Sequence, residues 1–458
     1  MDSSEQRVVG SYKDPSGYVF KKDGRIFRRI NECYLDTYKH VRDSGLFQEL
    51  IQKGLLIEHN EILFEQGGED PHAIIQPRMI RYISYPYEWS FSELRDAALA
   101  TLAIQRMAIL KGFTLKDAHG FNIQFDGGLP ALIDSLSFDR WDHTPWEAYG
   151  QFCESFLIPL ALMRYSGQSL NILLTNFLNG IPLEIGSKLL PLRSKLSMPL
   201  LMHVHLHASR AAGSKTGNTS PSSKSSQHFS KHSMLGLCLS LEKAIQSIRP
   251  PKVESWAESR NYSQYASDQE IKFISSIMQE KRYSIIWDLG SNTGKYSILA
   301  ANNSDLVIAI DSDPNCTEQL YQYCKKRQIT NILPLRMDLV NPSAALGWEL
   351  QERLSLFERG GCDLALALSL IHHLCISANI PIEYVARFFR SISNRLVIEF
   401  IPKEDPQVQT LLSSRKDIFT NYNRGAFETA FEQYFRIVRS EELSNSHRIL
   451  YYMNRRLI

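Results

Sequence analysis

The sequence predicts an α/β fold in the C-terminal half, with a doubly wound parallel sheet, and an α+β domain in the N-terminal half. Three observations carry this prediction. After residue 268, short apolar runs of strand length alternate with helical segments, which is typical of a parallel sheet covered on both faces. A glycine-containing turn, residues 288–294, stands between the first of these runs and a helix. Between the halves, residues 209–233 include a Ser/Gly/Lys-rich run that is typical of a linker.

Composition and charge limit the class of protein. The chain has 458 residues, 43% of them hydrophobic and 22% charged, and a formal net charge of +2. That length predicts two or three domains of soluble globular character. The near-neutral charge gives no electrostatic reason to expect nucleic acid as a partner. Seven cysteines without a CxxC pair, no apolar run of membrane-spanning length and no signal-peptide core predict a cytoplasmic protein without a membrane partner.

The N-terminal domain, residues 1–208, is expected to begin with strands and continue with helices. Residues 19–20 and 25–30 flank Asp23-Gly24, which predicts a hairpin with a tight turn. Three segments carry the apolar spacing of helices, namely residues 32–53, 92–110 and 146–165. Gly54 and Gly112 close the first two, and Pro159 interrupts the third.

The C-terminal domain, residues 234–458, is expected to begin with an amphipathic helix at 235–248 and a second helix from Asp268 to about Lys281. Strands are expected at residues 285–288, 306–311, 331–336, 363–368, 395–400, 435–440 and 448–454. The last two have no helix between them, which predicts an antiparallel hairpin at one edge of the sheet.

The turn after the first strand indicates a ligand. Asp288-Leu289-Gly290-Ser291-Asn292-Thr293-Gly294 joins that strand to a helix. Its glycines let the backbone pass close to a ligand, and the helix N-terminus offers free N–H groups. Asp311 ends the second strand, about 20 residues further on, where a ribose-binding carboxylate is expected. Together these features predict an adenosine-type cofactor.

Four segments in order resemble class I S-adenosylmethionine-dependent methyltransferases. They are the glycine turn, Asp311, Met337-Asp338-Leu339, and Asp363 followed by Ser369-Leu370-Ile371-His372-His373-Leu374. The resemblance covers about residues 255–458. It implies a Rossmann-like methyltransferase sheet and S-adenosyl-L-methionine as cofactor. This chain departs from the family pattern at Asn292, where many members have a third glycine. Asn tolerates left-handed backbone conformations, so the turn can be preserved.

The resemblance assigns a role to each matching position. The cofactor-binding residues are Asp288 at the amino group of the cofactor, Gly290, Asn292 and Gly294 in the turn, Asp311 at the ribose, Asp338 and Leu339 at the adenine, and Ser369 beside the methyl group. For Asp311 and Asp338 the alternative is a strand-end carboxylate that caps a helix. Trp256, Tyr262 and Tyr265 either lie over the cofactor, as this segment often does in the fold, or pack on the sheet.

His372 and His373 are the candidate catalytic residues. Methyl transfer needs an aligned, deprotonated nucleophile, and a histidine near neutral pKa accepts a proton from a hydroxyl. The alternative is that one ring packs under the sheet and the other hydrogen-bonds a loop. The Asn-Pro-Pro-Tyr/Phe sequence of amino-methylating enzymes does not occur at this position, which argues against a planar amide or amine as the acceptor. The expected acceptor is an oxygen of a small molecule, such as a sugar or secondary metabolite, and a carbon or nitrogen is the alternative. Glu399 ends the fifth strand and either lines the acceptor site or meets solvent.

A second motif lies in the N-terminal domain. Asp117 and Asn122, followed by an apolar strand that ends at Asp134, resemble the catalytic and metal-binding loops of protein-kinase-like phosphotransferases. The resemblance implies that Asp117 positions an acceptor while Asn122 and Asp134 hold Mg²⁺ with a nucleotide. The chain departs from the pattern at the glycine-rich loop, for which Ser16-Gly17 is the nearest candidate. It also departs at the strand lysine, for which Arg28 or Arg29 is the candidate substitute. A degenerate kinase-like module is therefore favoured over an active kinase, and simple turn capping is a third interpretation.

The two-part layout resembles a bacterial group related to nodulation protein NoeA. The matching segments are Tyr87-Glu88-Trp89-Ser90 and Leu94-Arg95-Asp96-Ala97-Ala98-Leu99, upstream of Leu115-Lys116-Asp117. The leading hypothesis is an S-adenosylmethionine-dependent methyltransferase whose kinase-like half helps to recognise the acceptor. The alternatives are an active Mg-ATP phosphotransferase in the N-terminal half, or a binding protein that is catalytically silent.

Overall fold

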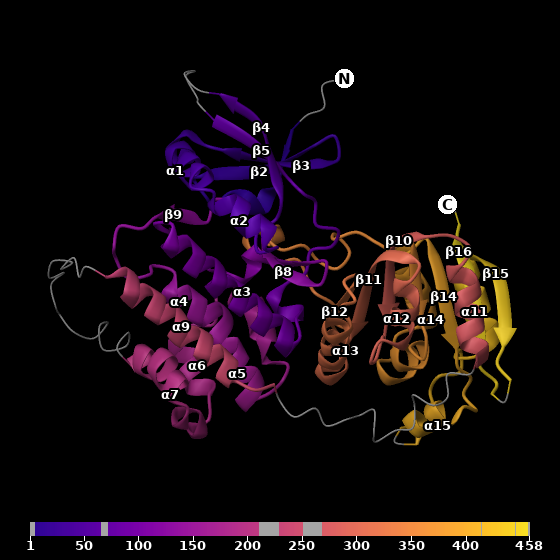
Figure 1. The fold of residues 1–458 in the computed structure, drawn as a ribbon. Coiled ribbons are helices and arrows are strands. Elements are labelled where there is room, and N and C mark those ends of the chain that lie inside the picture. The colour runs from indigo at the N-terminus through magenta and orange to yellow at the C-terminus, as the bar shows by residue number, and fades with distance from the viewer. Residues whose placement is uncertain are drawn as a thin grey trace. The chain divides into compact units, whose positions relative to one another are not determined.

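The structure, a computed structural model, describes residues 5–65, 72–209, 229–250, 268–413, 415–444 and 446–456. The chain divides into two compact units (Figure 1): Met1–Lys252 with Ala345–Arg353, and Val253–Ala344 with Leu354–Ile458. The Ser/Gly/Lys-rich run and the predicted aromatic segment with Trp256, Tyr262 and Tyr265 lie outside the described residues.

This division differs from the predicted boundaries at Ala345–Arg353 and at one helix. We expected the helix at 235–248 in the C-terminal domain, but α9 (Lys231–Ser247) belongs to the first unit. It packs along α3 (Phe91–Leu110), and Arg106 of α3 forms an ion pair of 2.8 Å with Glu242 of α9. The apolar face that the sequence shows on this helix is therefore covered by α3.

The first unit begins with an antiparallel sheet. Its strand order is β1 (Gln6–Arg7), β2 (Gly17–Lys22), β3 (Arg25–Ile30), β5 (His72–Pro77) and β4 (His59–Glu65). The predicted hairpin is confirmed, since Lys22 pairs with Arg25 across Asp23 and Gly24. Both turn residues have positive φ, 50° and 73°, as a two-residue turn that follows the strand twist requires. We did not predict β4 and β5.

Helices follow in the first unit. The single helix expected at 32–53 is two helices, α1 (Glu32–Asp43) and α2 (Leu46–Gln52), because Gly45 between them has a φ of 73°. The helix expected at 92–110 is confirmed as α3, which begins with a capping box between Ser90 and Glu93. The remaining strands and α-helices are β6 (Phe113–Leu115), β7 (Ile123–Asp126), β8 (Leu129–Leu132), β9 (Phe138–Arg140), α4 (Tyr149–Phe152), α5 (Ile158–Tyr165), α6 (Leu183–Leu189) and α7 (Met198–Leu200). A π-helical turn, Cys153–Leu157, joins α4 to α5.

The second unit contains the predicted mixed sheet. In spatial order its strands are β12 (Ile332–Arg336), β11 (Ser304–Asp311), β10 (Tyr283–Leu289), β13 (Leu364–Ala367), β14 (Arg395–Phe400), β16 (Ile449–Arg455) and β15 (Phe435–Glu442). Neighbours from β12 to β14 are parallel, whereas β16 is antiparallel to both β14 and β15. The predicted strands and the edge hairpin are therefore confirmed, and the sheet is Rossmann-like.

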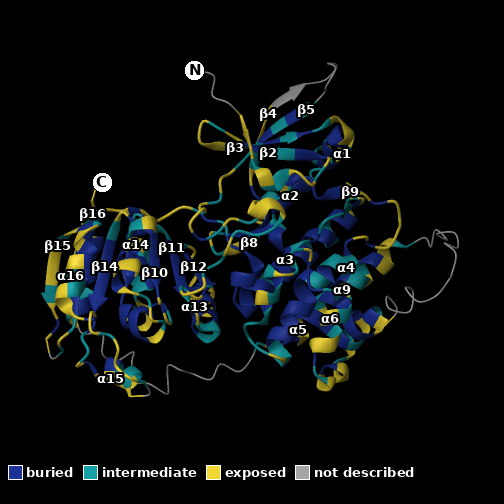
Figure 2. Cartoon of the chain, turned by 180° about the vertical axis from the view of Figure 1, so that it is seen from behind, coloured by how far each residue is buried: buried dark blue, intermediate teal, exposed yellow. Residues whose placement is uncertain are grey.

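Helices connect these strands and bury the sheet. They are α11 (Asp268–Met278), α12 (Lys295–Ala301), α13 (Pro314–Arg327), α14 (Ile382–Ile392), α15 (Pro406–Leu412) and α16 (Arg424–Glu432). Phe273 of α11 and Leu320 of α13 join Val307 and Leu364 in one buried apolar cluster. The central strands are accordingly dark blue in Figure 2. Among the described residues, no helix combines the length and the apolar character that crossing a membrane requires.

Candidate functional site

The strand order of the second unit places its candidate site. From β10 the chain runs outward to β11 and β12, and then returns to β13 on the other side of β10. Asp288, near the carboxyl end of β10, pairs with Ala309 of β11 and Leu366 of β13. Ligands of open α/β sheets bind at the carboxyl ends of the strands where the order reverses. The glycine turn leaves β10 at this point.

The glycine turn has the backbone conformation that the sequence predicts. Gly290, Asn292 and Gly294 have φ values of 75°, 49° and 85°, so the expected left-handed conformation of Asn292 is confirmed. At Gly294 a Cβ atom would lie 2.3 Å from Leu320 Cδ1. Any side chain there would displace the buried side chain of Leu320 on α13, so Gly294 is needed for packing as well as for its dihedral angles.

Asp311 holds this turn in place from the end of β11. Its Oδ2 accepts the N–H of Asn292 at 2.8 Å, and its Oδ1 accepts the N–H of Asp313 at 2.9 Å. Burial raises the pKa of Asp311, against the effect of these hydrogen bonds. The helix that follows, α13, is capped by the side chain of Asp313. The alternative role of Asp311 as a helix cap is therefore wrong, and its carboxylate lies against the glycine turn.

The side chain of Asp288 is buried and hydrogen-bonded within the protein. It is 2% exposed, and its Oδ2 accepts a hydrogen bond of 2.5 Å from Ser297 Oγ in the first turns of α12. Burial raises its pKa to about 7, with Ser297 opposing the shift and the charge of Asp311 adding to it. The second oxygen, Oδ1, remains the candidate for the predicted contact with the cofactor's amino group, because the bond from Ser297 is made to Oδ2.

Asp338 and Leu339 follow β12, on the outer side of β11. Asp338 is exposed and Leu339 is half-buried. Asp338 Oδ1 accepts the N–H of Val340 at 2.9 Å, and its backbone oxygen accepts the N–H of Asn341 at 3.0 Å. The side chain thus stabilises a tight turn, and no described helix starts there for it to cap. The second oxygen of the carboxylate remains the candidate for the adenine amine.

Ser369 leaves β13 with a φ of 51°, an uncommon conformation for a residue other than glycine. Its N–H and its Oγ both donate to Glu399 Oε2, at 2.8 and 3.1 Å. Glu399, on β14, is 2% exposed, and its Oε1 accepts a hydrogen bond of 3.3 Å from Arg448. The alternative that Glu399 meets solvent is therefore wrong. Sequence reasoning did not connect Glu399 with Ser369, although both end neighbouring strands.

The two candidate catalytic histidines have different surroundings. Their ring centroids are 4.1 Å apart, but His372 is buried and His373 is exposed. Burial, together with the nearby charges of His373 and Arg448, lowers the pKa of His372 to about 3. A ring with this pKa stays neutral and accepts a proton poorly. The structure thus favours His373 over His372 as a proton acceptor.

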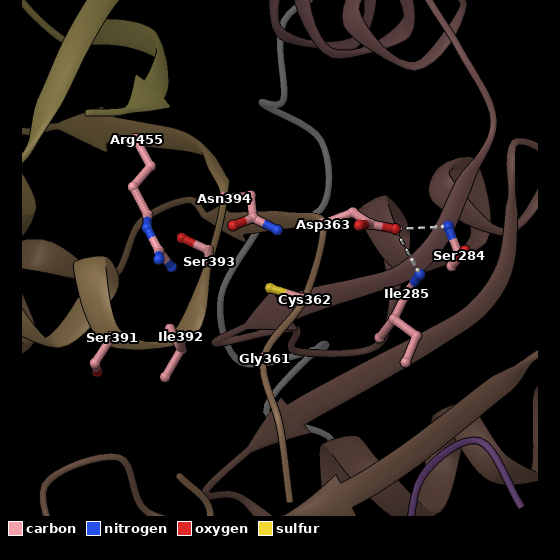
Figure 3. Close-up of a pocket in the computed structure, with 10 residues that line it drawn as sticks. All are labelled: Ser284, Ile285, Gly361, Cys362, Asp363, Ser391, Ile392, Ser393, Asn394 and Arg455. Atoms are coloured by element: carbon pink, nitrogen blue, oxygen red, sulfur yellow. Dashed lines mark hydrogen bonds between the residues drawn. The ribbon is translucent and has the colours of Figure 1, made fainter. Parts of the chain in front are cut away.

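A cavity at the other end of the sheet is unrelated to these residues (Figure 3). It lies at the amino ends of β10, β13 and β14, beside Arg455. Asp363, part of the sequence pattern, lines it and accepts the N–H groups of Ser284 and Ile285 at 2.8 and 3.3 Å. Asp363 therefore fixes the start of β10 and takes no part at the carboxyl ends of the strands.

In the first unit, the carboxylate of the predicted metal ligand Asp134 is paired with an arginine. Arg28, on β3 and 8% exposed, forms an ion pair with Asp134 and lies 3.7 Å from Asp14. Burial raises the pKa of Asp134, but the charge of Arg28 and the hydrogen bonds from Leu136 N–H, Ser137 and Arg28 together exceed this effect, so the pKa is lowered. Arg28 thus comes from the expected strand, but it neutralises the acid that was predicted to bind Mg²⁺.

The other two predicted kinase-like residues lie on the neighbouring loop. The carboxylate of Asp117 accepts the N–H of His119 at 3.0 Å, and the backbone oxygen of Asn122 accepts the N–H of Ile133 at 2.9 Å. Burial and the charge of Asp134 raise the pKa of Asp117. Within the described residues there is no group of three or more His, Cys, Asp or Glu side chains that suits a metal ion.

The fold and this site define the second unit as a Rossmann-like α/β unit with a nucleotide-type turn at its switch point. No protein-family model matches the chain. Over 461 residues the chain is 32% identical to nodulation protein NoeA of Rhizobium meliloti (strain 1021), covering 98% of this chain and 96% of that protein. The chain belongs to the NoeA family, as the sequence resemblance predicts.

Two solved structures are distantly similar. N-methyltransferase NodS from Bradyrhizobium japonicum WM9, in complex with S-adenosyl-L-homocysteine, aligns with 44% of this chain and 91% of its own at 12% identity and a TM-score of 0.32. The bifunctional kinase-methyltransferase WbdD aligns with 44% of this chain and 43% of its own at 17% identity and a TM-score of 0.31.

Proposed function

We propose that the second unit is an S-adenosylmethionine-dependent methyltransferase that methylates an oxygen of a small molecule, such as a sugar or secondary metabolite. The first unit would help to recognise that acceptor. The observation that carries the proposal is the hydrogen bond from Asn292 N–H to Asp311. It joins a left-handed turn without bulky side chains to an acidic strand end at the switch point, which is where an adenosine cofactor is held.

The residues of the site fit such a cofactor. Ser291 Oγ, within the glycine turn, is buried and has no hydrogen-bond partner among the described residues, so a ligand donor or acceptor would satisfy it. At Gly290 a Cβ atom would have only ordinary contacts, the nearest at 3.4 Å from Leu370, so the backbone is open to close approach. Asp311 would hold the ribose hydroxyls, and Asp338 with Leu339 the adenine.

When bound, the cofactor supplies an electrophilic methyl group. The protein must align the acceptor hydroxyl and take up its proton. His373 is exposed and is our candidate for that proton, while His372 packs against it as a neutral ring. Ser369 and its partner Glu399 would shape the wall of the acceptor site at the end of β13.

The first unit is better suited to binding than to phosphoryl transfer. A phosphotransferase would need Asp134 as a ligand for Mg²⁺, but here Arg28 already neutralises that carboxylate. Magnesium-dependent ATP turnover that disappears in Asp134→Asn would instead establish the alternative of an active phosphotransferase.

Calorimetric titration of S-adenosylhomocysteine into the full chain tests the cofactor site. The wild type should bind in the micromolar range, and Asp311→Ala should weaken binding by about 1–3 kcal/mol, the usual effect of unpaired polar groups. Asp305→Ala is the matched control, because Asp305 lies near the amino end of the same strand and pairs with Arg282. Equal affinities in wild type and Asp311→Ala would refute the assignment. If cofactor binding is established, a screen of cell extract with labelled S-adenosylmethionine would identify the acceptor.

A further inference from the structure

One short segment, Ala345–Arg353, belongs to the first unit although the chain on both sides of it belongs to the second. It is a closed loop with a defined shape. Leu346 and Arg353 bond to each other through their backbones, with N···O distances of 2.9 and 3.1 Å. Gly347 has a φ of 89°, and a Cβ atom on it would lie 2.5 Å from the Cβ of Glu352. The loop is thus folded tightly around the Glu352 side chain.

Glu352 joins this loop to the loop between β1 and β2. Its Oε1 accepts Tyr12 O–H at 2.9 Å, and its Oε2 accepts the ammonium of Lys13 at 2.8 Å. A Cβ atom on Gly10 would lie 3.1 Å from the Glu352 backbone oxygen, so the two backbones are close. The Glu352 side chain is only 6% exposed. Burial raises its pKa, but Lys13, Trp348 N–H and Tyr12 together lower it to about 2, so it stays charged.

Arg353, the next residue, joins the same segment to the loop that carries Asp117 and Asn122. Its guanidinium lies 4.2 Å from the centroid of the Phe121 ring, within range of a cation–π interaction. Burial lowers the pKa of Arg353, while nearby tyrosines and the charges of Glu352 and Asp117 raise it. A half-buried guanidinium is destabilising without compensating partners, and this unit provides both an aromatic face and acidic groups.

The segment therefore contacts two loops to which the kinase resemblance assigns functional roles. In protein kinases a loop between the first strands covers the phosphates of the nucleotide, and a second loop carries the catalytic Asp and a metal-binding Asn. In this chain the corresponding positions are residues 8–16 and residues 117–122. We propose that Ala345–Arg353 is the resident ligand of the first unit, held between these two loops, and that the first unit is a docking module for this segment which does not bind nucleotide.

The charge pattern supports this assignment. A triphosphate would need cations and free backbone N–H groups from the first loop, but the Lys13 ammonium is already taken by Glu352. Glu352 thus presents to this loop an anionic group of the kind that a phosphate would present. The second loop, which carries Asn122 as a predicted ligand of Mg²⁺, receives a cation from the segment, because Arg353 lies over the ring of Phe121. The segment supplies both charges from within the chain.

Hydrogen exchange on the full chain tests the docking. Glu352→Gln keeps the shape of the side chain but removes the charge that pairs with Lys13. Exchange of residues 8–16 and 345–353 should then rise on the order of tenfold, the effect expected from losing a charged hydrogen bond. Glu349→Gln is the matched control, because Glu349 lies on the same loop and is exposed. Equal exchange in the two variants would refute the docking.

Calorimetry with Mg²⁺ and ATP tests the second half of the proposal. No heat of binding is expected for the wild-type chain at millimolar nucleotide. Micromolar binding by the wild type, with protection of residues 8–16 from exchange when nucleotide is added, would overturn the proposal. Neither measurement depends on methyltransferase activity, so the outcome is separate from that of the proposed function.

Discussion

Glu399→Gln is the substitution that best tests how the site is built. The carboxylate accepts two hydrogen bonds from Ser369 and one from Arg448. A glutamine has the same shape, but its single oxygen cannot serve both partners. Arg448 remains paired through its two bonds to Asp405, of 2.7 and 3.1 Å, so the main effect falls on Ser369.

The magnitude follows from two contributions. A charge-assisted hydrogen bond contributes about 1.5–3 kcal/mol, and a positive φ at a residue other than glycine costs about 1–3 kcal/mol, which only the surrounding contacts offset. We expect Glu399→Gln to reduce the free energy of unfolding by about 2–3 kcal/mol. For a unit of this size this corresponds to a fall in Tm of roughly 4–12 °C, which calorimetry measures directly. Glu432→Gln, at an exposed position of α16, is the control and should leave Tm unchanged.

A double-mutant cycle separates the strain at Ser369 from general loss of packing. Ser369→Gly relieves the positive φ in both backgrounds, but only in the wild type does it also remove the charge-assisted bond from Ser369 Oγ to Glu399. It should therefore be more favourable in the Glu399→Gln background, by about 1 kcal/mol or more. If Ser369→Gly has the same effect on Tm in both backgrounds, the Ser369–Glu399 bond does not stabilise this turn and the reasoning is refuted.

Two further predictions concern buried charges. Because the folded-state pKa of Asp288 is raised to about 7, its contribution to stability is complete below pH 4 and is lost as pH rises toward 7, by at most about 1.4 kcal/mol per pH unit. In Asp288→Asn, Tm should depend less on pH across this range than in the wild type. Parallel pH profiles of Tm for the two proteins would contradict the raised pKa of Asp288. Arg28→Met leaves the buried carboxylate of Asp134 without its cation and should cost about 3–5 kcal/mol in urea unfolding. The double variant Arg28→Met/Asp134→Leu should recover most of this loss. An additive loss of stability in the double variant would contradict the role of Arg28 as the partner of a buried carboxylate.

The sheet of the second unit could be predicted because each of its strands is marked by a pattern in a short stretch of sequence. Strands buried on both faces are short continuous apolar runs, as in Leu364–Ala367, and each is bounded by polar or glycine residues. The turn conformation at Asn292 could also be predicted, since it depends on the residue's own backbone preference. The helix break at Gly45 had a signal that we did not use, a Ser-Gly pair inside an apolar pattern.

The pairings between distant residues could not be predicted. His372 and His373 are identical in type and adjacent, and only the packing around α15 and the strand ends decides which one is buried. Glu352 pairs with Lys13 across 339 positions of sequence, and neither residue stands in a recognisable motif. Such pairings depend on which surfaces meet after folding, and a charged residue in a loop looks the same in sequence whether it is solvated or buried.

The two acids at the carboxyl ends of β10 and β11 differ in charge, which bears on the proposed cofactor site. Asp288 is the more deeply buried, and its raised pKa of about 7 includes a contribution from the charge of Asp311. Two ionised carboxylates so close would repel each other, so the inner acid carries less charge while Asp311 is stabilised by N–H groups of the chain. A neutral diol that donates two hydrogen bonds would add to those donors without adding charge. In the proposed cofactor site this arrangement would favour a ribose over an anionic group beside Asp311, because a phosphate there would be repelled by the charged carboxylate.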